Sequence, residues 1–104
     1  MAQFDIYANP NPRSRRTVPY LLDVQSDLLS GLSTRVVAPL VRASEIKKPA
    51  THLNPHFVVR DTKVVMSTAE LAGVPSEALG EIVGSLKSRR DEIIAALDFL
   101  ITGF

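Results

Sequence analysis

Three short segments in the first half of the chain have the hydrophobic pattern of β-strands. Polar and apolar residues alternate in residues 3–7, so Phe4 and Ile6 are expected on one face of a sheet. Residues 19–24 and 35–41 are rich in apolar side chains, and the second of them also in β-branched ones, which favour strands. The three segments predict a sheet with at least one buried face.

The middle of the chain predicts a β-hairpin and one ambiguous stretch. Residues 56–60 and 63–66 read as two strands joined at Asp61 and Thr62. Residues 69–72 have helical propensity but are soon followed by a proline, so both continuing strand and a short helical turn stay open. Pro39, inside the third strand, has no amide proton to donate and is expected at an edge or a bulge.

The last segment predicts an α-helix from about Ser85 to Ile101. Ser85 and Ser88 are candidate N-caps, and Ser88 opens a Ser-Arg-Arg-Asp string that fits a capping box. Gly103 is expected to end the helix. Together the segments predict an antiparallel sheet with a helix packed on it, an α+β fold. The apolar residues at helical spacing are Leu86, Ile93, Leu97 and Leu100, with Ile94 and Ile101 beside them.

Two groups of apolar residues can be read in two ways. Leu28, Leu29 and Leu32 lie in a turn rich in serine and glycine, and the residues alone favour core side chains over a contact surface. Residues 98–104 are apolar where termini are usually polar, so this end is either docked in the core or presented to a partner. The docked arrangement is favoured by the residues alone.

Composition limits the class of protein. The 104 residues predict a single domain, 1–104, and 45% hydrophobic with 22% charged residues is a globular balance. The absence of cysteine excludes disulfides, thiolate catalysis and cysteine–zinc sites. Residues 1–7 lack the pattern of a signal peptide, and no apolar run approaches the roughly 20 residues that a bilayer requires. A cytoplasmic protein that does not contact membranes is expected.

Charge and motifs give no sign of nucleic-acid binding or catalysis. The formal net charge is +1, so direct DNA binding is not expected, and the cluster Arg13, Arg15 and Arg16 is read as a solvated loop rather than a phosphate site. His52 and His56 are separated by Asn-Pro, which disfavours a shared helical metal site. No nucleophile elbow, phosphate-binding loop or dinucleotide motif is present. No enzyme, metal or cofactor is predicted.

The order of several motifs resembles the CcdB family of toxins over nearly the whole chain, apart from residues 42–54. The most specific string is Asp-Val-Gln-Ser-Asp followed by two leucines. The matching stretches are Gln3-Phe4-x-Ile6-Tyr7, Leu22 to Leu29, Arg35-Val36-Val37-x-Pro39-Leu40, Val74-Pro75 and Ile101-Thr102-Gly103-Phe104.

This resemblance implies a fold and an activity. The fold would be an SH3-like small β-barrel with a C-terminal helix, shared with the MazF and Kid toxins and assembled as a homodimer. The activity would be that of a type II toxin–antitoxin toxin that binds the dimerisation region of the DNA gyrase A subunit. Such a toxin traps gyrase on cleaved DNA, performs no chemistry itself, and acts by stabilising one conformation of its target.

The resemblance also implies which residues contact gyrase, and it reverses the interpretation of both apolar groups. The implied contacts are Ser26, Leu28, Leu29, Asp98, Thr102, Gly103 and Phe104. One position departs from the family, because the familiar members carry tryptophan where this chain has Thr102. Tryptophan is a frequent hot-spot residue, so weaker poisoning of gyrase is expected.

The family further implies an antitoxin whose disordered C-terminal tail folds on the toxin. Its contacts cannot be assigned residue by residue, and the divergent 42–54 loop is a hypothesis for antitoxin specificity. Two alternatives remain at this point. One is a MazF- or Kid-like endoribonuclease using Arg60, Thr68 and Glu70, and the other is a homologue that no longer poisons gyrase.

Overall fold

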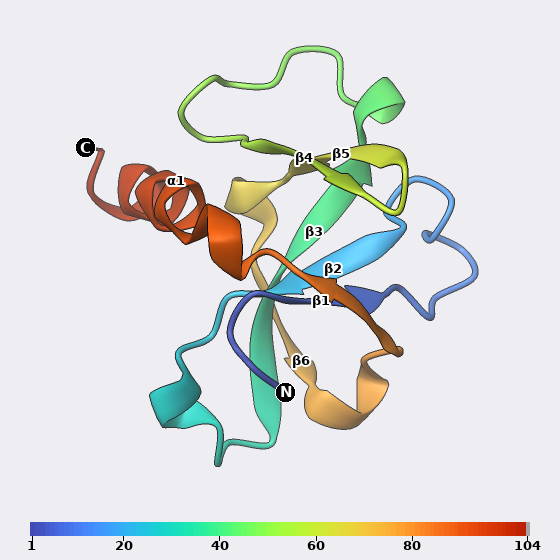
Figure 1. Ribbon diagram of the computed structural model, residues 1–104, viewed down its shortest axis with the longest axis vertical. Coiled ribbons are helices and arrows are strands. Elements are labelled where there is room, and N and C mark those ends of the chain that lie inside the picture. The colour runs from blue at the N-terminus through green and yellow to red at the C-terminus, as the bar shows by residue number, and fades with distance from the viewer. Residues whose placement is uncertain (104) are drawn as a thin grey trace.

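The computed structural model describes residues 1–103, and its main feature is an antiparallel sheet of seven strands that curls into a half-barrel (Figure 1). The neighbouring strands run β4-β5-β3-β2-β1-β7, and β6 pairs with β3 beside this path. The strands are β1 (Asp5–Ala8), β2 (Tyr20–Asp23), β3 (Thr34–Arg42), β4 (His56–Val59), β5 (Thr62–Met66), β6 (Ala72–Pro75) and β7 (Ile82–Ser85). The α-helix α1 (Arg90–Thr102) follows, so the predicted α+β fold is confirmed.

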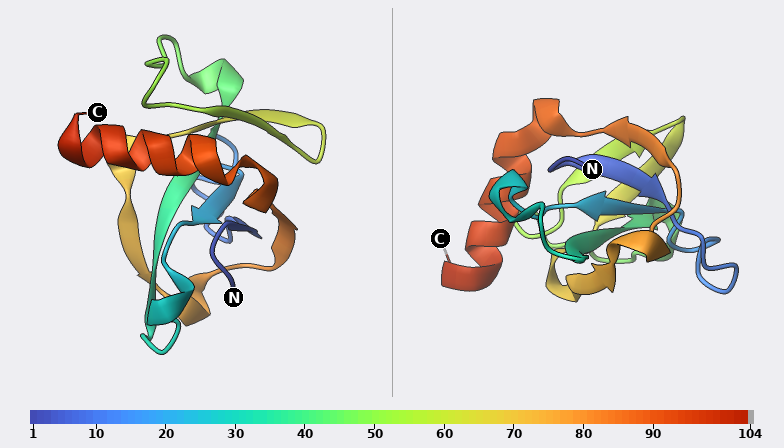
Figure 2. Two further views of the ribbon diagram at one scale, coloured as in Figure 1. Left: turned by 60° about the vertical axis from the view of Figure 1, so that its left-hand side comes forward. Right: turned by 90° about the horizontal axis from the view of Figure 1, so that it is seen from below.

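The concave face of the sheet forms the main hydrophobic core, and α1 lies against it (Figure 2). Phe4 and Ile6 are both buried there, as their spacing predicts, although Phe4 precedes β1 and has a positive φ of 71°. Ile93 and Ala96 are the buried residues of α1 and join the same core. Sheet and helix therefore stabilise each other by burying one apolar surface.

The other face of β1, β2 and β3 is also buried, but its residues are partly polar. Cross-strand register places Tyr7 opposite Leu21 and Asp23 opposite Val37, on the side away from the main core. Asp23 and Arg35 are almost completely buried on this side. A strand with both faces covered has no simple alternation of polar and apolar residues, so this second core could not be seen in the sequence.

Pro39 lies in the middle of β3, at neither an edge strand nor a bulge. Beyond it β3 pairs with β5, and before it β3 pairs with β6. The Pro39 carbonyl accepts a hydrogen bond from the Ser67 amide on that side. Since the N–H and C=O of a strand residue point the same way, the missing donor faces the place where β3 changes its partner from β6 to β5.

The hairpin between β4 and β5 forms, with its turn one residue earlier than expected. The turn residues are Arg60 and Asp61, whose φ angles are 47° and 65°, and Thr62 already belongs to β5. Two positive φ values define the mirror-image turn that matches the twist of a two-residue hairpin. Aspartate tolerates a positive φ better than most residues, so Asp61 does indicate the turn, but it occupies the second turn position and not the first.

The structure settles one open sequence expectation and corrects two others between residues 68 and 103. The ambiguous stretch resolves into a 3₁₀ turn at Thr68–Glu70 followed by β6. Ser85 ends β7 instead of opening the helix, and its Oγ accepts from the Lys87 amide at 3.2 Å. The N-cap of α1 is Arg89, without a side-chain cap, so the capping box at Ser88 does not form. At the other end Gly103 closes α1 with φ 79°, as predicted.

Gly80 is required where the chain passes β1. A Cβ at this position would overlap the carbonyl oxygen of Ala8, a backbone atom that cannot move aside. We expect Gly80→Ala to lower the free energy of unfolding by about 1–3 kcal/mol, as over-packing does. Gly73→Ala is the control, because a Cβ there has no neighbour within 4 Å. Chemical denaturation of both variants measures the difference, and equal stability would contradict the close approach.

Candidate functional site

The 3₁₀ turn η1 (Asp27–Leu29) is held in place by polar groups. Ser26 caps it, with its Oγ accepting from the Leu28 amide at 3.2 Å. The Asp27 carboxylate accepts from the Gln3 amide at 2.8 Å, and the Gln25 side chain donates to the Leu29 carbonyl at 3.1 Å. Hydrogen bonds to side chains thus fix the turn without burying its leucines.

The leucines of this turn project into solvent. Leu28 is 95% exposed, and Leu29 and Leu32 are at least half exposed. The interpretation of these residues as core, which the sequence alone favours, is therefore wrong for the described chain. The turn presents an apolar surface that costs free energy in water and is typical of a contact site.

The end of α1 is also exposed. Ile101 is 75% exposed, and Thr102 and Gly103 are open to solvent as well. The Thr102 hydroxyl donates to the carbonyl of Asp98 at 2.7 Å, so it satisfies the helix and does not anchor a tail. The docked arrangement is wrong for residues 101–103, while Leu100 is half-buried, and the expected contact Phe104 lies outside the described residues.

The η1 turn and the end of α1 lie on the same side of the molecule but do not meet. In Figure 1 both are on the left, with α1 across the upper half and η1 below. The right-hand view of Figure 2 looks along that direction and shows the two roughly in line. A single copy of the chain therefore offers two separate apolar points, at Leu28 and at Ile101, on one side.

Ile101, which the sequence places beside the apolar stripe of the helix, is a surface residue. The stripe has its buried members at Ile93 and Ala96, and Ile101 follows them by more than one turn. The helix extends past the edge of the sheet at this point (Figure 2), and within residues 1–103 Ile101 stays exposed. Sequence spacing could not reveal where the sheet ends.

Beside the start of α1, Arg89 links the helix to strand β4. Its guanidinium bonds both carboxylate oxygens of Glu92, at 2.6 and 2.8 Å, and donates to the His56 carbonyl at 3.3 Å. It also lies 4.9 Å from the centroid of the Phe57 ring, a cation–π distance. The hydrogen bond from Arg89 lowers the pKa of Glu92, and the same contact raises the pKa of Arg89.

Two open cavities flank this arginine. One, of about 280 Å³, lies along β4 and β5, and the other, of about 380 Å³, lies between α1 and the residues before β4. Both are lined by His56 and Arg89. Neither cavity contains any of the expected gyrase contacts, so this is a second candidate site on a different part of the surface.

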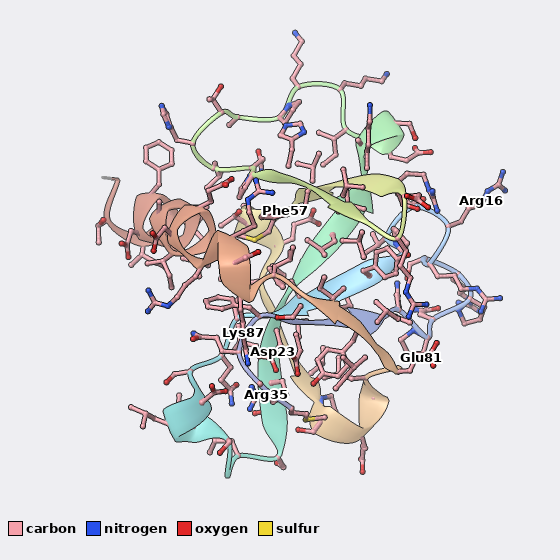
Figure 3. All side chains as sticks on the ribbon, in the orientation of Figure 1. Arg16, Asp23, Arg35, Phe57, Glu81 and Lys87 are labelled. Atoms are coloured by element: carbon pink, nitrogen blue, oxygen red, sulfur yellow. The ribbon has the colours of Figure 1, made fainter. Side chains whose placement is uncertain are left out.

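The remaining candidates from sequence are dispersed. Thr68 is buried and its hydroxyl donates to the Leu53 carbonyl, Glu70 accepts from Ser67 at 2.5 Å, and Arg60 is exposed at the hairpin turn. A buried, already bonded threonine is not available to a substrate. The basic loop at Arg16 is exposed, and Figure 3 shows this side chain pointing outward.

Residues 1–103 contain no group of three or more His, Asp or Glu side chains arranged to hold a metal ion. No helix among them is sufficiently long and apolar to cross a membrane.

Comparison with known protein families gives a match over nearly the whole chain. The sequence model described as "CcdB protein" matches residues 3–103, and so includes the η1 turn, the second core and the whole of α1. The match also covers residues 42–54, the loop that the resemblance of the motifs leaves out.

Proposed function

The chain belongs to the CcdB family of toxin–antitoxin toxins, which is not a family of catalytic enzymes, and on this premise we propose that it binds the A subunit of DNA gyrase. Binding would trap gyrase on cleaved DNA and block replication and transcription, until an antitoxin similar to CcdA removes the toxin in the cytoplasm. The toxin needs only a higher affinity for the cleaved state than for the other states of gyrase.

The observation that carries this proposal is the exposure of apolar residues that no part of the described chain covers. Leu28 and Ile101 lie on one side of the molecule, held by a polar-capped turn and by a helix. Rigid supports lower the entropy lost on binding. The proposed gyrase contacts remain Ser26, Leu28, Leu29, Asp98, Thr102, Gly103 and Phe104.

We further propose that the toxin acts as a homodimer. A twofold axis would repeat both apolar points and present two copies of each to a twofold target. The separation of η1 from the end of α1 in one copy is compatible with a binding surface completed by the second copy. Sedimentation equilibrium of the purified toxin measures the mass of the assembly and so distinguishes a dimer from a monomer.

Supercoiling and DNA-cleavage assays with purified gyrase test the proposal. The toxin should inhibit supercoiling and leave covalent gyrase–DNA products, at higher concentrations than a member with tryptophan in place of Thr102. An absence of both effects would instead indicate a homologue that no longer poisons gyrase. Cleavage of RNA by the toxin without gyrase would overturn the proposal in favour of an endoribonuclease, although the buried Thr68 disfavours that alternative.

A further inference from the structure

The open edge of β4 has unpaired backbone groups facing outward. β4 is the last strand of the sheet, and it pairs with β5 through the register Val59–Thr62, Phe57–Val64 and Pro55–Met66. The two-residue turn makes Val59 and Thr62 a hydrogen-bonded pair, and the Met66 amide donates to the Pro55 carbonyl in the same alternation. Val58 and His56, between these pairs, must therefore direct their amides and carbonyls away from β5.

Only one of these outward groups has a partner among residues 1–103. Arg89 donates to the His56 carbonyl at 3.3 Å, while no hydrogen bond reaches the amide or carbonyl of Val58. The Val58 side chain is 63% exposed. Proteins normally protect an edge strand by charge, proline or a covering segment, and an edge left open next to a cavity can accept an additional strand.

The surface along this edge is basic with apolar patches. The two cavities that meet at Arg89 extend along β4 on one side and toward α1 on the other. Phe57, labelled in Figure 3, lines the first of them. Glu92 is the only acidic residue in either lining, and Arg89 already neutralises it. Because Glu92 likewise neutralises Arg89, Lys63 is the uncompensated charged residue of the two linings, which also contain His52 and His56.

We propose that the β4 edge binds an extended, acidic segment of the antitoxin as an additional β-strand. This inference rests on the proposed toxin–antitoxin function. Backbone hydrogen bonds to Val58 would supply affinity, and carboxylates beside Lys63 and His56 would select an acidic sequence. A disordered tail suits this site because it can adopt the extended conformation on binding. Within residues 1–103, none of the proposed gyrase contacts lines either cavity.

The variant Val58→Pro tests the strand pairing directly. Proline removes the outward amide and is tolerated on an edge strand where that amide faces solvent. The matched control is Val58→Thr, which retains the amide and the β-branched shape. The probe is the antitoxin's C-terminal tail as a synthetic peptide, and its affinity is measured by fluorescence anisotropy. We expect about tenfold weaker binding for Val58→Pro and less than a threefold change for Val58→Thr.

A second variant, Lys63→Glu, tests the charge and keeps the proposal falsifiable if Val58→Pro fails to fold. It should weaken peptide binding about fivefold and reduce the dependence of affinity on salt. Gyrase inhibition by each folded variant should equal that of the unmodified toxin. The unmodified toxin could fail to inhibit gyrase while Val58→Pro still lowers the affinity for the peptide. In that case the gyrase proposal fails and the inference about the β4 edge stands.

Three outcomes would overturn the inference. Unchanged peptide affinity in both Val58→Pro and Lys63→Glu would show that the tail binds elsewhere. Loss of gyrase inhibition in the same two variants would show that the β4 edge contacts gyrase. Conversion of a dimer to a monomer in Val58→Pro, detected by sedimentation, would show that the edge pairs with a second copy of this chain.

Discussion

Replacing Arg35 with methionine should lower the free energy of unfolding by about 3–5 kcal/mol, the usual cost of leaving a buried charge without its partner. The Arg35 Nε donates to Asp23 Oδ2 at 2.8 Å, and Nη2 approaches the same oxygen at 2.7 Å. Asp23 and Arg35 are 0% and 1% exposed, and Figure 3 shows them together below the crossing of the strands. Water cannot replace the lost guanidinium.

The pH dependence of this variant gives an independent check. Burial raises the pKa of Asp23, although Arg35 and the Gln25 amide, 3.0 Å from Oδ1, both act to lower it. Without Arg35 the folded-state pKa should rise further above the unfolded value. Folding then favours the protonated carboxyl, so the stability deficit is largest near neutral pH and shrinks as the pH falls through the folded-state pKa.

Denaturant unfolding between neutral and acidic pH measures both effects. The matched control is the double variant Asp23→Asn with Arg35→Met, which removes both charges and should recover part of the lost stability. A deficit that is independent of pH, or a double variant no better than Arg35→Met alone, would indicate lost packing instead of an unpaired charge.

Replacing Leu28 with aspartate should weaken gyrase binding by about 30-fold or more while changing stability little. The side chain is 95% exposed, so no core contact is lost on folding. At the proposed interface the new carboxylate would be desolvated, and a hot-spot residue contributes about 2 kcal/mol or more. Competition binding to the gyrase A subunit, beside thermal unfolding of the toxin, separates the two effects.

The control for this substitution is Ile82→Asp, which places the same charge at another exposed apolar residue, on β7 and away from η1. It should leave gyrase binding unchanged. Deleting residues 102–104 should abolish binding and leave a folded protein, because Thr102 and Gly103 are exposed. If Leu28→Asp or the deletion lowers stability as much as binding, these residues support the fold and not the interface.

Local periodicity predicted much of the fold. The alternation at Phe4 and Ile6, the β-branched run of β3 and the helical spacing around Ile93 each correspond to an observed element. The two strands that sequence reasoning did not recognise, β6 and β7, have four residues each and contain glycine. Such strands are too short to show an alternating pattern, and glycine weakens a strand, so they depend on neighbours that offer hydrogen-bonding partners.

The candidate site was less accessible to sequence reasoning. Residues alone placed Leu28 in the core, and only the resemblance to CcdB toxins placed it on the surface. The hydrogen bonds that hold its turn come from Gln3, more than twenty positions away, and from Gln25. Arg89 was not singled out at all, although its position directly before the helical stripe and three residues from Glu92 was a usable signal.

The sequence by itself determined the first five strands, the presence of a C-terminal helix and the side chains that share a face in them, because these depend on spacing along a few consecutive residues. The tertiary structure alone decided which faces are covered. Arg35 became a buried partner of Asp23, while Ile101 and the edge of β4 stayed open, because coverage depends on segments distant in the chain reaching the same place.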